Sequence, residues 1–550
     1  MKYTTVPLCL TILPLLAACA GAPVSKSTPD IATPAAWRNA AAGAAQAPAN
    51  NGASVVPRDA RASAAPASAD APAAASRREA TAGGVADRGQ STPQAEWWRA
   101  FASAELDDLL ARALQGNHDL AAAAARVDQA YAALRVADAS RVPSLNAQAS
   151  AGGDGRLGAR QASSASGASY NAALRASYEI DLRGRNRALS DSAAAQLQAS
   201  RYEREASRLS VTGAVVNAWL QRSALSERLA IADANIASAE RMLALVAARV
   251  RAGAAHPLEL AQQRGLLAAQ QRQRAELHQQ HEDSHLALAL LLGQPAANVH
   301  LGAWHRADTD SAAAPNARSG SDPKVGTSSA APDVRSGADP KVDAGSAVPL
   351  QRLRLPTADA GLPSALLARR PDIASAEAQL AAADADLAAA RAALFPSLTL
   401  DGALASSAKG FSGLFDNPVY SLAAAISAPL FDGGRLAAGR DLAGARRQEL
   451  LAAYRRTVMA AFADVERALN AIASLAIQRS AQDEELREAG RALALAEARY
   501  RAGAENALTL LDAQRTLYAA QDASLQLQLA RLQASVALHQ ALGGGWQQGS

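Results

Sequence analysis

The sequence predicts a mainly α-helical protein with a β part that enters a membrane, built from two copies of one structural unit. Three observations predict this class. The segment RVRAGAAHPLEL around Gly253 recurs 250 residues later as RYRAGAENALTL around Gly503. Four short runs alternate apolar with polar residues, and long proline-free stretches are rich in Ala, Leu, Arg and Gln. We therefore expect each repeat to contain a helix, two strands, a long helix and, after a glycine turn, another helix.

The alternating runs have the length of strands that cross a bilayer at a tilt, about 9–12 residues. Each has one apolar and one polar face, as lipid on one side and water on the other require. Four strands cannot close a barrel, and an open edge in lipid leaves unpaired backbone groups. The sequence therefore predicts an oligomer. Three chains would supply 12 strands, although closure alone does not force the number three. The runs lie at residues 145–151, 174–183, 398–404 and 420–430.

The helices are expected to be unusually long. A proline-free stretch of about 65 residues from Arg435 would reach roughly 100 Å at 1.5 Å per residue. Within and after it, large apolar residues recur every seven positions, which predicts a coiled-coil seam. These residues are Leu486, Leu493 and Tyr500, followed by Leu511, Tyr518, Leu525 and Leu532.

The N-terminus has the features of an export signal. The apolar run within residues 1–18 is too short to span a membrane and is typical of a signal peptide. It ends Leu16-Ala-Ala-Cys19, which resembles the lipobox of bacterial lipoproteins, where the cysteine thiol receives a lipid. Ala20 at the following position favours the outer membrane in such proteins. The alternative is a plain signal peptide followed by an incidental cysteine.

Two stretches are expected to be linkers without catalytic or binding residues. The composition of residues 19–92 predicts a disordered tether, and that of residues 303–349 predicts a low-complexity insert.

The composition also excludes several classes of protein. The formal charge of +4 shows no electrostatic footprint for nucleic acid. The only cysteines are Cys9 and Cys19, which excludes a disulfide framework in the mature chain. After the N-terminus, no apolar run is long enough for a transmembrane helix.

Six motifs occur in order along the two repeats: Trp97-Trp98 with Phe101 and Leu106, Leu367-Ala-Arg-Arg-Pro-Asp-Ile373, Ala393-Leu-Phe-Pro-Ser-Leu398, Pro429-Leu-Phe-Asp-Gly-Gly-Arg435, Arg499-Tyr-Arg-Ala-Gly503 and Leu511-Asp-Ala-Gln514. Together they resemble those of the TolC/OprM-type outer-membrane efflux factors, in particular the NodT-type lipoproteins. The resemblance covers two repeats, residues 93–302 and 350–545, followed by a tail at 546–550. It implies a homotrimer with a 12-strand outer-membrane β-barrel on a periplasmic α-helical coiled-coil barrel. It also implies docking to a periplasmic adaptor protein and an inner-membrane pump of the resistance-nodulation-division (RND) type.

The two glycine turns are candidate contacts with the adaptor. Gly253 and Gly503 interrupt long helices, because glycine readily adopts the left-handed conformation that ends a helix. By resemblance they are the periplasmic tips, and Arg251 and Arg501 beside them would add polar contacts. The alternative is a purely structural turn flanked by solvated charges.

Three residues are candidates for a periplasmic aperture. Leu508 and Asp512 are four residues apart, so they share one helix face. In the family the matching positions line the aperture, where three Asp512 carboxylates would form a ring that attracts cations. Tyr500 matches a position in the hydrogen bonds that hold the gate shut. The alternative for Asp512 is an ordinary ion pair between helices.

Two further motifs imitate catalytic sites. His281-Glu-Asp-Ser-His285 fits H-E-x-x-H of zinc peptidases, but no third ligand follows and the segment lies in a predicted seam helix. Gly153-Asp-Gly-Arg-Leu-Gly158 fits G-x-G-x-x-G, but no helix opens after it, so we expect a hairpin loop. We therefore expect no enzyme, no metal and no cofactor beyond the covalent lipid on Cys19.

The expected function is a passive outer-membrane exit duct of a tripartite efflux pump for small toxic compounds or drugs. The runner-up is the exit duct of a type I protein-secretion system, which would share the architecture. A lipid-anchored zinc peptidase and a purely structural coiled-coil lipoprotein are weaker alternatives. The latter leaves the four alternating runs unexplained.

Overall fold

The computed structural model describes residues 96–153, 168–299 and 361–546, together with residues 33, 34, 36, 37, 350 and 353. They form two compact units. The first is built mainly from residues 123–204 and 372–459. The second contains most of the remaining described residues. The expected signal peptide, Cys19 and the 303–349 insert lie outside the described residues.

The three main helices of each repeat follow the same order and have the same lengths. The first helix of each repeat has 22 residues, the long helix 67 and the last helix 35. This agreement confirms the element order that the sequence repeat predicts. In the first repeat the helices are α3 (His118–Ala139), α4 (Arg185–Arg251) and α5 (Pro257–Leu291); in the second they are α6 (Pro371–Ala392), α7 (Arg435–Arg501) and α8 (Ala507–Ala541).

Shorter helices precede or follow these elements. Ser103 caps α2 through its hydroxyl oxygen, which accepts a hydrogen bond from the backbone N–H of Leu106 at 3.3 Å. The short helices are η2 (Trp97–Phe101), α2 (Ala104–Gly116), η3 (Ala296–Asn298), η5 (Pro363–Ala368) and η6 (Phe411–Gly413). None of the described helices combines the length and hydropathy needed to cross a membrane.

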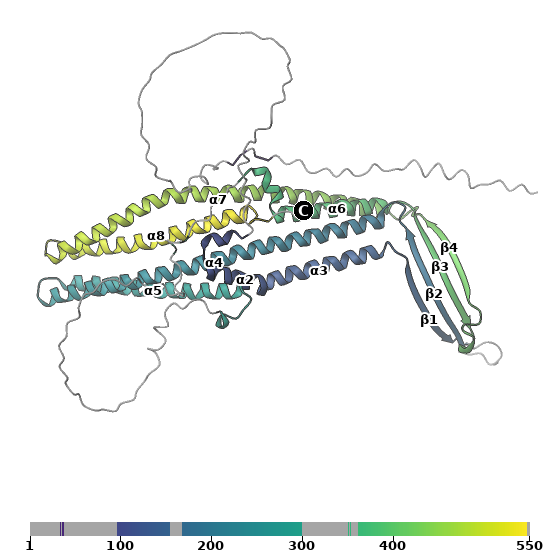
Figure 1. Cartoon of the computed structure of the whole chain (residues 1–550), viewed down its shortest axis with the longest axis horizontal. Helices are drawn as coiled ribbons and strands as arrows, with labels where there is room; N and C mark the ends of the chain where they lie inside the picture. The colour runs from purple at the N-terminus through teal and green to yellow at the C-terminus, as the bar shows by residue number, and fades with distance from the viewer. Residues whose placement is uncertain are drawn as a thin grey trace, which may run out of the picture. The chain divides into compact units, whose positions relative to one another are not determined.

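The first unit contains a four-stranded antiparallel sheet of order β1-β2-β3-β4 (Figure 1). The middle strands come from different repeats, and Tyr170 of β2 pairs with Ala408 of β3 at one end of that ladder. The two outer strands, β1 and β4, each have one edge without a partner in the described chain. The strands are β1 (Ser144–Gly153), β2 (Ala168–Ile180), β3 (Ser397–Ala408) and β4 (Val419–Ser427).

The register keeps the two faces of the sheet chemically distinct. One row across the four strands joins Leu145, Ala176, Gly402 and Leu422. The next row joins Ser144, Ser177, Asp401 and Ala423. Because side chains alternate along a strand, the apolar rows all lie on one face and the polar rows on the other. The alternation expected from the sequence is therefore preserved across the whole sheet.

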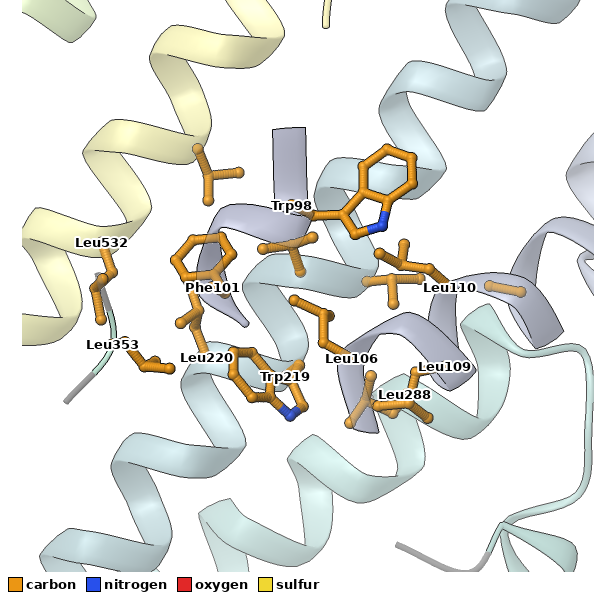
Figure 2. Close-up of a cluster of buried hydrophobic side chains, with 14 of the residues drawn as sticks. Trp98, Phe101, Leu106, Leu109, Leu110, Trp219, Leu220, Leu288, Leu353 and Leu532 are labelled. Carbon is orange, nitrogen blue, oxygen red and sulfur yellow. The ribbon is translucent and has the colours of Figure 1, made fainter. Parts of the chain in front are cut away.

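The second unit has its largest core where four helices and η2 meet (Figure 2). Few aromatic residues occur in the chain, yet Trp97, Trp98, Phe101 and Trp219 are all buried here. Trp219 donates a hydrogen bond from Nε1 to Glu105 at 3.1 Å, which satisfies its indole N–H. Leucines complete this core: Leu106, Leu109 and Leu110 of α2, Leu220 of α4, Leu288 of α5 and Leu532 of α8.

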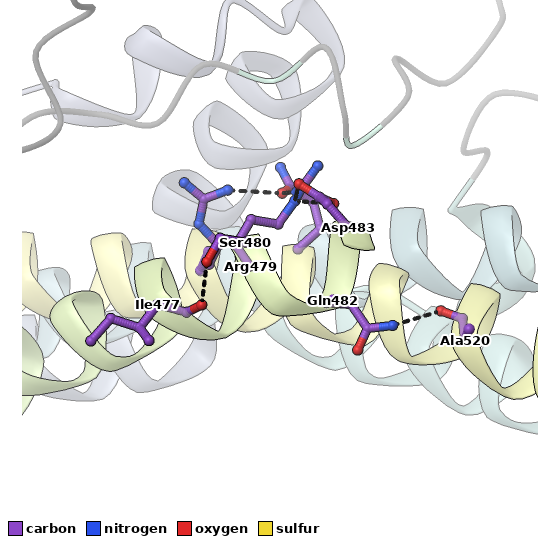
Figure 3. A network of polar contacts seen from close by, with 8 residues as sticks. Ile477, Arg479, Ser480, Gln482, Asp483 and Ala520 are labelled. Atoms are coloured by element: carbon purple, nitrogen blue, oxygen red, sulfur yellow. Dashed lines mark hydrogen bonds and ion pairs between the residues drawn. The ribbon is translucent and has the colours of Figure 1, made fainter. Parts of the chain in front are cut away.

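The seam residues predicted on α8 are buried as expected. Leu511, Tyr518, Leu525 and Leu532 are all less than a tenth exposed. Above this seam, α7 and α8 also make polar contacts, and Gln482 donates a hydrogen bond to the carbonyl of Ala520 at 3.2 Å (Figure 3). The apolar stripe of α8 packs on the first repeat, where Leu511 and Tyr518 cluster with Leu266 of α5, and α7 adds a polar contact beside it.

Trp37 departs from the disordered tether expected over residues 19–92. Its side chain is only 5% exposed. Its indole Nε1 donates a hydrogen bond to the carbonyl of Gly361 at 2.9 Å, and its ring meets Phe462 edge to face. The sequence reading missed this contact because a single tryptophan in an Ala/Pro-rich stretch has no periodicity.

Candidate aperture site

Both glycine turns close α-helices in the same way, at the same end of the second unit (Figure 1). Gly253 and Gly503 have φ of 71° and 75°, in the left-handed region that favours glycine. The residue after each glycine donates its N–H five residues back, from Ala254 to Arg249 at 2.8 Å and from Ala504 to Arg499 at 2.9 Å. Their role as structural turns is therefore visible in the backbone.

The helices that follow the two turns are capped differently. Nδ1 of His256 accepts a hydrogen bond from the N–H of Leu258 at 3.2 Å, and Glu259 completes a capping box. In the second repeat, Asn506 Oδ1 accepts from the N–H of Thr509 at 2.9 Å. Both caps satisfy donors that the first helical turn would leave unpaired.

Tyr500 is held by residues of the other repeat. Its hydroxyl donates a hydrogen bond to Glu259 Oε2 at 3.0 Å. The Arg249 guanidinium lies 4.4 Å from the ring centroid and also donates to the Tyr500 carbonyl at 2.5 Å. Burial and the neighbouring Glu259 carboxylate raise the pKa of Tyr500 to about 12. We call Arg249, Glu259 and Tyr500 the tip clasp.

The sequence reading selected Tyr500 but missed its partner. Glu259 follows His256 by three residues, and this capping-box spacing was the available signal. Arg499 occupies the position equivalent to Arg249, but it pairs instead with Glu505 of its own turn at 3.2 Å. The two tips are therefore alike in backbone and different in side-chain bonding.

The predicted aperture residues share an exposed face of α8. Leu508 is 56% exposed, and Asp512 one turn later is exposed as well. Within the described residues Asp512 makes no ion pair, so its carboxylate faces open space on this chain. Leu258, the equivalent of Leu508 in the first repeat, is 60% exposed. The 250-residue offset was the signal that could have identified Leu258.

The arginines beside the turns are exposed. Arg501 pairs with Glu497 one turn earlier at 3.1 Å, and its own side chain is 62% exposed whereas that of Glu497 is 22% exposed. Such exposed pairs contribute little to stability. Arg251 lies at the matching end of α4 and is exposed.

The H-E-x-x-H motif lies on a partly exposed face of α5, with Glu282 and Asp283 exposed and both histidines only partly covered. His281 contacts Glu282 at 3.3 Å, whereas His285 meets the carbonyl of Ala296. Burial, together with Arg222, lowers the pKa of His281. In the described ranges, no three His, Cys, Asp or Glu residues are grouped as metal ligands. Of the G-x-G-x-x-G motif only Gly153, at the end of β1, lies in the described residues.

Paired helical hairpins on long helices, joined to a two-faced sheet with open edges, are typical of channel-forming outer-membrane proteins. A family model described as outer membrane efflux protein matches residues 109–294 and 362–544. The chain belongs to this family. It is an outer-membrane efflux channel, and the family and its relatives are channel proteins and not enzymes.

Individual relatives match most of the chain. The pyoverdine export outer membrane protein OpmQ of Pseudomonas putida is 45% identical over 84% of this chain and 91% of its own. The outer membrane protein OprJ of Pseudomonas aeruginosa is 33% identical over 85% and 90%. The open-state structure of the MtrE outer membrane channel of Neisseria gonorrhoeae superposes with a TM-score of 0.67. It is 29% identical and covers 83% of this chain and 93% of that one.

Proposed function

We propose that this chain is the passive exit duct of a tripartite efflux pump. Three copies form the duct, and a periplasmic adaptor joins it to an inner-membrane pump of the RND type. The pump supplies the energy, and the duct releases small compounds outside the cell. In this proposal, residues 93–302 and 350–545 are the two channel repeats, and residues 303–349 are an insert outside the conduction path.

The sheet carries this proposal. It has an apolar face, a polar face and two outer strands, β1 and β4, that each lack a neighbour in the described chain. In a bilayer each unpaired backbone group costs several kcal/mol, so such a sheet is stable only if another copy pairs with its edges. Three copies give 12 strands, a number within the range of outer-membrane barrels.

The first experiment is the native mass of the purified, lipidated protein in detergent, measured by light scattering or native mass spectrometry. A trimer supports closure of the barrel from three sheets. A stable monomer would leave four strands with open edges and would overturn the duct. Labelling with radioactive palmitate tests the anchor separately, because Cys19→Ser is expected to abolish the label without changing the number of chains in the oligomer.

The cargo is expected to be small. OpmQ, at 45% identity, is named for the export of pyoverdine, which favours a small exported compound over a secreted protein. The alternative, a type I protein-secretion duct, predicts that deletion of the gene stops secretion of one protein. The efflux duct predicts instead accumulation of small compounds and increased sensitivity to drugs.

The gate is proposed at the tips. Leu508 would form an apolar ring and Asp512 a carboxylate ring, while the tip clasp at Tyr500 holds the helices in the closed position. Gly253, Gly503, Arg251 and Arg501 would meet the adaptor, whose docking opens the ring. The exposure of Leu508 and Asp512 on one face of α8 supports this assignment.

Replacement of Asp512 tests the gate. Asp512→Ala removes three carboxylates from the narrowest ring, so single-channel conductance in planar bilayers is expected to rise and cation preference to fall. Asp128→Ala, an exposed position on α3, is the matched control and is expected to leave both unchanged. An unaltered conductance for Asp512→Ala would remove this residue from the gate.

A further inference from the structure

The polar face of the sheet carries one arginine near the middle of a strand. Arg175 of β2 lies opposite Asn146 of β1 and Ala403 of β3, so both of its direct cross-strand neighbours are uncharged. Its side chain is exposed, and it makes no ion pair with any described residue. The nearest carboxylate along the face is the diagonal neighbour Asp401, which accepts a hydrogen bond from the Ser177 hydroxyl at 2.7 Å.

A hollow of about 350 Å³ adjoins Arg175 on the side away from Asp401. Small side chains, Ala173 and Ala405, pair across β2 and β3 there and leave space above the sheet. Amides and hydroxyls surround this space, and none of the described residues that line it is acidic. We call this hollow the Arg175 niche; its polar lining includes Gln148, Asn171 and Ser407.

These groups match the chemistry of a carboxylate. A guanidinium offers paired N–H donors to two carboxylate oxygens, and amides and hydroxyls add further donors. A cationic ligand would find no negative partner in the hollow. The neutral neighbours also leave the charge of Arg175 largely uncompensated, so its field extends into the space above the sheet.

We propose that the Arg175 niche is a binding site for the carboxylate of anionic cargo on its way through the barrel. This inference rests on the proposed duct, in which the polar face lines the lumen and three niches form one ring. A charged side chain in the middle of a strand is costly against lipid, which also places this face toward water. The niche therefore favours anions at the barrel, in contrast to the cation-attracting ring proposed at Asp512.

A reporter thiol measures the local potential without depending on the gate. The only native cysteines are Cys9 and Cys19, so Gln148→Cys introduces a distinct thiol beside Arg175. Cells that carry this variant are treated from outside with a sulfonate-bearing or a trimethylammonium-bearing methanethiosulfonate reagent. The ratio of the two reaction rates reports the local charge, and unmodified chain gives the background.

Arg175→Gln is expected to lower the ratio of anionic to cationic reaction rates at Gln148→Cys about twofold. This estimate follows from one unit charge acting across the roughly 8 Å between diagonal neighbours in screened water. Arg175→Lys should keep the ratio, and Asp401→Asn should leave it nearly unchanged, because Asp401 lies about two Debye lengths from position 148. An unchanged ratio in Arg175→Gln, with both reagents still reacting, would overturn the niche and leave the duct intact.

Leu145→Cys on the apolar face distinguishes failure of the niche from failure of the duct. If the duct is right, lipid covers this position, and neither charged reagent reacts there. Equal reaction at Leu145→Cys and Gln148→Cys would show water on both faces and overturn the barrel itself. Addition of succinate, a dicarboxylate, should slow the anionic reagent at Gln148→Cys in the wild-type background and have no effect with Arg175→Gln.

Discussion

Tyr500 is the single residue on which the two hairpins of one chain depend most directly at their tips. Its phenol is buried, and both of its clasp partners belong to the first repeat. Tyr500→Phe removes a hydrogen bond to a carboxylate, which is expected to cost about 1.5–3 kcal/mol of tip stability. Single-channel conductance should therefore rise. Tyr131→Phe, at a half-exposed position on α3, is the control and should behave as wild type.

The tip clasp should not respond to pH in the physiological range. The pKa of Tyr500 is raised to about 12 in the folded chain. A raised pKa means that the stabilisation is complete below the ordinary value near 10 and is lost as the pH rises through 12. Closed-state conductance is therefore expected to stay constant between pH 6 and 8 in bilayers. A rise in conductance within that window would assign gating to another titrating group.

His539 makes the second unit sensitive to acid. Burial lowers its pKa, its ring stacks on Trp97 at 5.1 Å, and Nδ1 donates to the Ser535 carbonyl. A lowered histidine pKa favours the neutral form, so stability is complete above about pH 6.5 and falls as the pH drops toward the folded-state value. Thermal unfolding should shift to lower temperature between pH 7.5 and 5, and His539→Phe should reduce that shift.

Because His281 is also buried with a lowered pKa, His539→Phe is expected to remove part of the acid sensitivity and not all of it. His118→Gln, at an exposed position, is the matched control. If His539→Phe keeps the full acid shift, protonation of His539 does not limit stability.

At the scale of helices and strands, most of the structure could be predicted from the hydrophobic pattern and the spacing of residues in the sequence. Helix ends followed from turn glycines, because the backbone conformation of a turn is set locally, and the seam from Leu511 to Leu532 followed from seven-residue spacing, which places its members on one helix face. The clasp partner Glu259 could not be predicted with the same ease. It lies more than 200 residues from Tyr500, and only packing of two hairpins brings their side chains together.

The strand faces give a matched pair of substitutions. Leu422 lies on the apolar face of β4, and its neighbour Ser421 lies on the polar face. If the apolar face meets lipid, Leu422→Arg should lower the stability of the barrel by about 2–4 kcal/mol for each substituted chain. Ser421→Arg places the same charge in water and should have little effect on stability. The measurement is the amount of assembled oligomer in the outer membrane. Equal loss for both variants would contradict the assignment of faces.

At the scale of the whole molecule, the insert is expected to be dispensable. The chain on either side of it is fixed in the same core, through Val299 before it and Leu350 after it. Leu350 is held further by Gln528, which donates to its carbonyl at 3.4 Å. Replacement of residues 303–345 by about 12 Gly/Ser residues, which span roughly 20 Å, should leave assembly and drug efflux unchanged. Loss of efflux with intact oligomers would reveal a role for the insert.

The internal repeat made the order of helices and strands predictable, because the same pattern occurs twice in the sequence. The structure reflects this repeat, because the long helices α4 and α7 are equal in length and so are the last helices α5 and α8. The differences between halves were harder to anticipate. Arg249 and Arg499 occupy equivalent positions, yet one clasps Tyr500 and the other pairs with Glu505. This difference depends on which side chains come into contact in the folded chain, so it could not be predicted from residue spacing alone.

The contact of Trp37 with Gly361 and Phe462 also limits the distance between the proposed lipid anchor at Cys19 and the folded part of the chain. From Cys19 to Trp37 the chain has 18 peptide units, which span at most about 60 Å when fully drawn out. Without that contact, the connecting chain would extend from Cys19 to Trp97 and could span up to about 270 Å. One buried indole would thus set how far the second unit can stand from the membrane leaflet that carries the proposed lipid anchor.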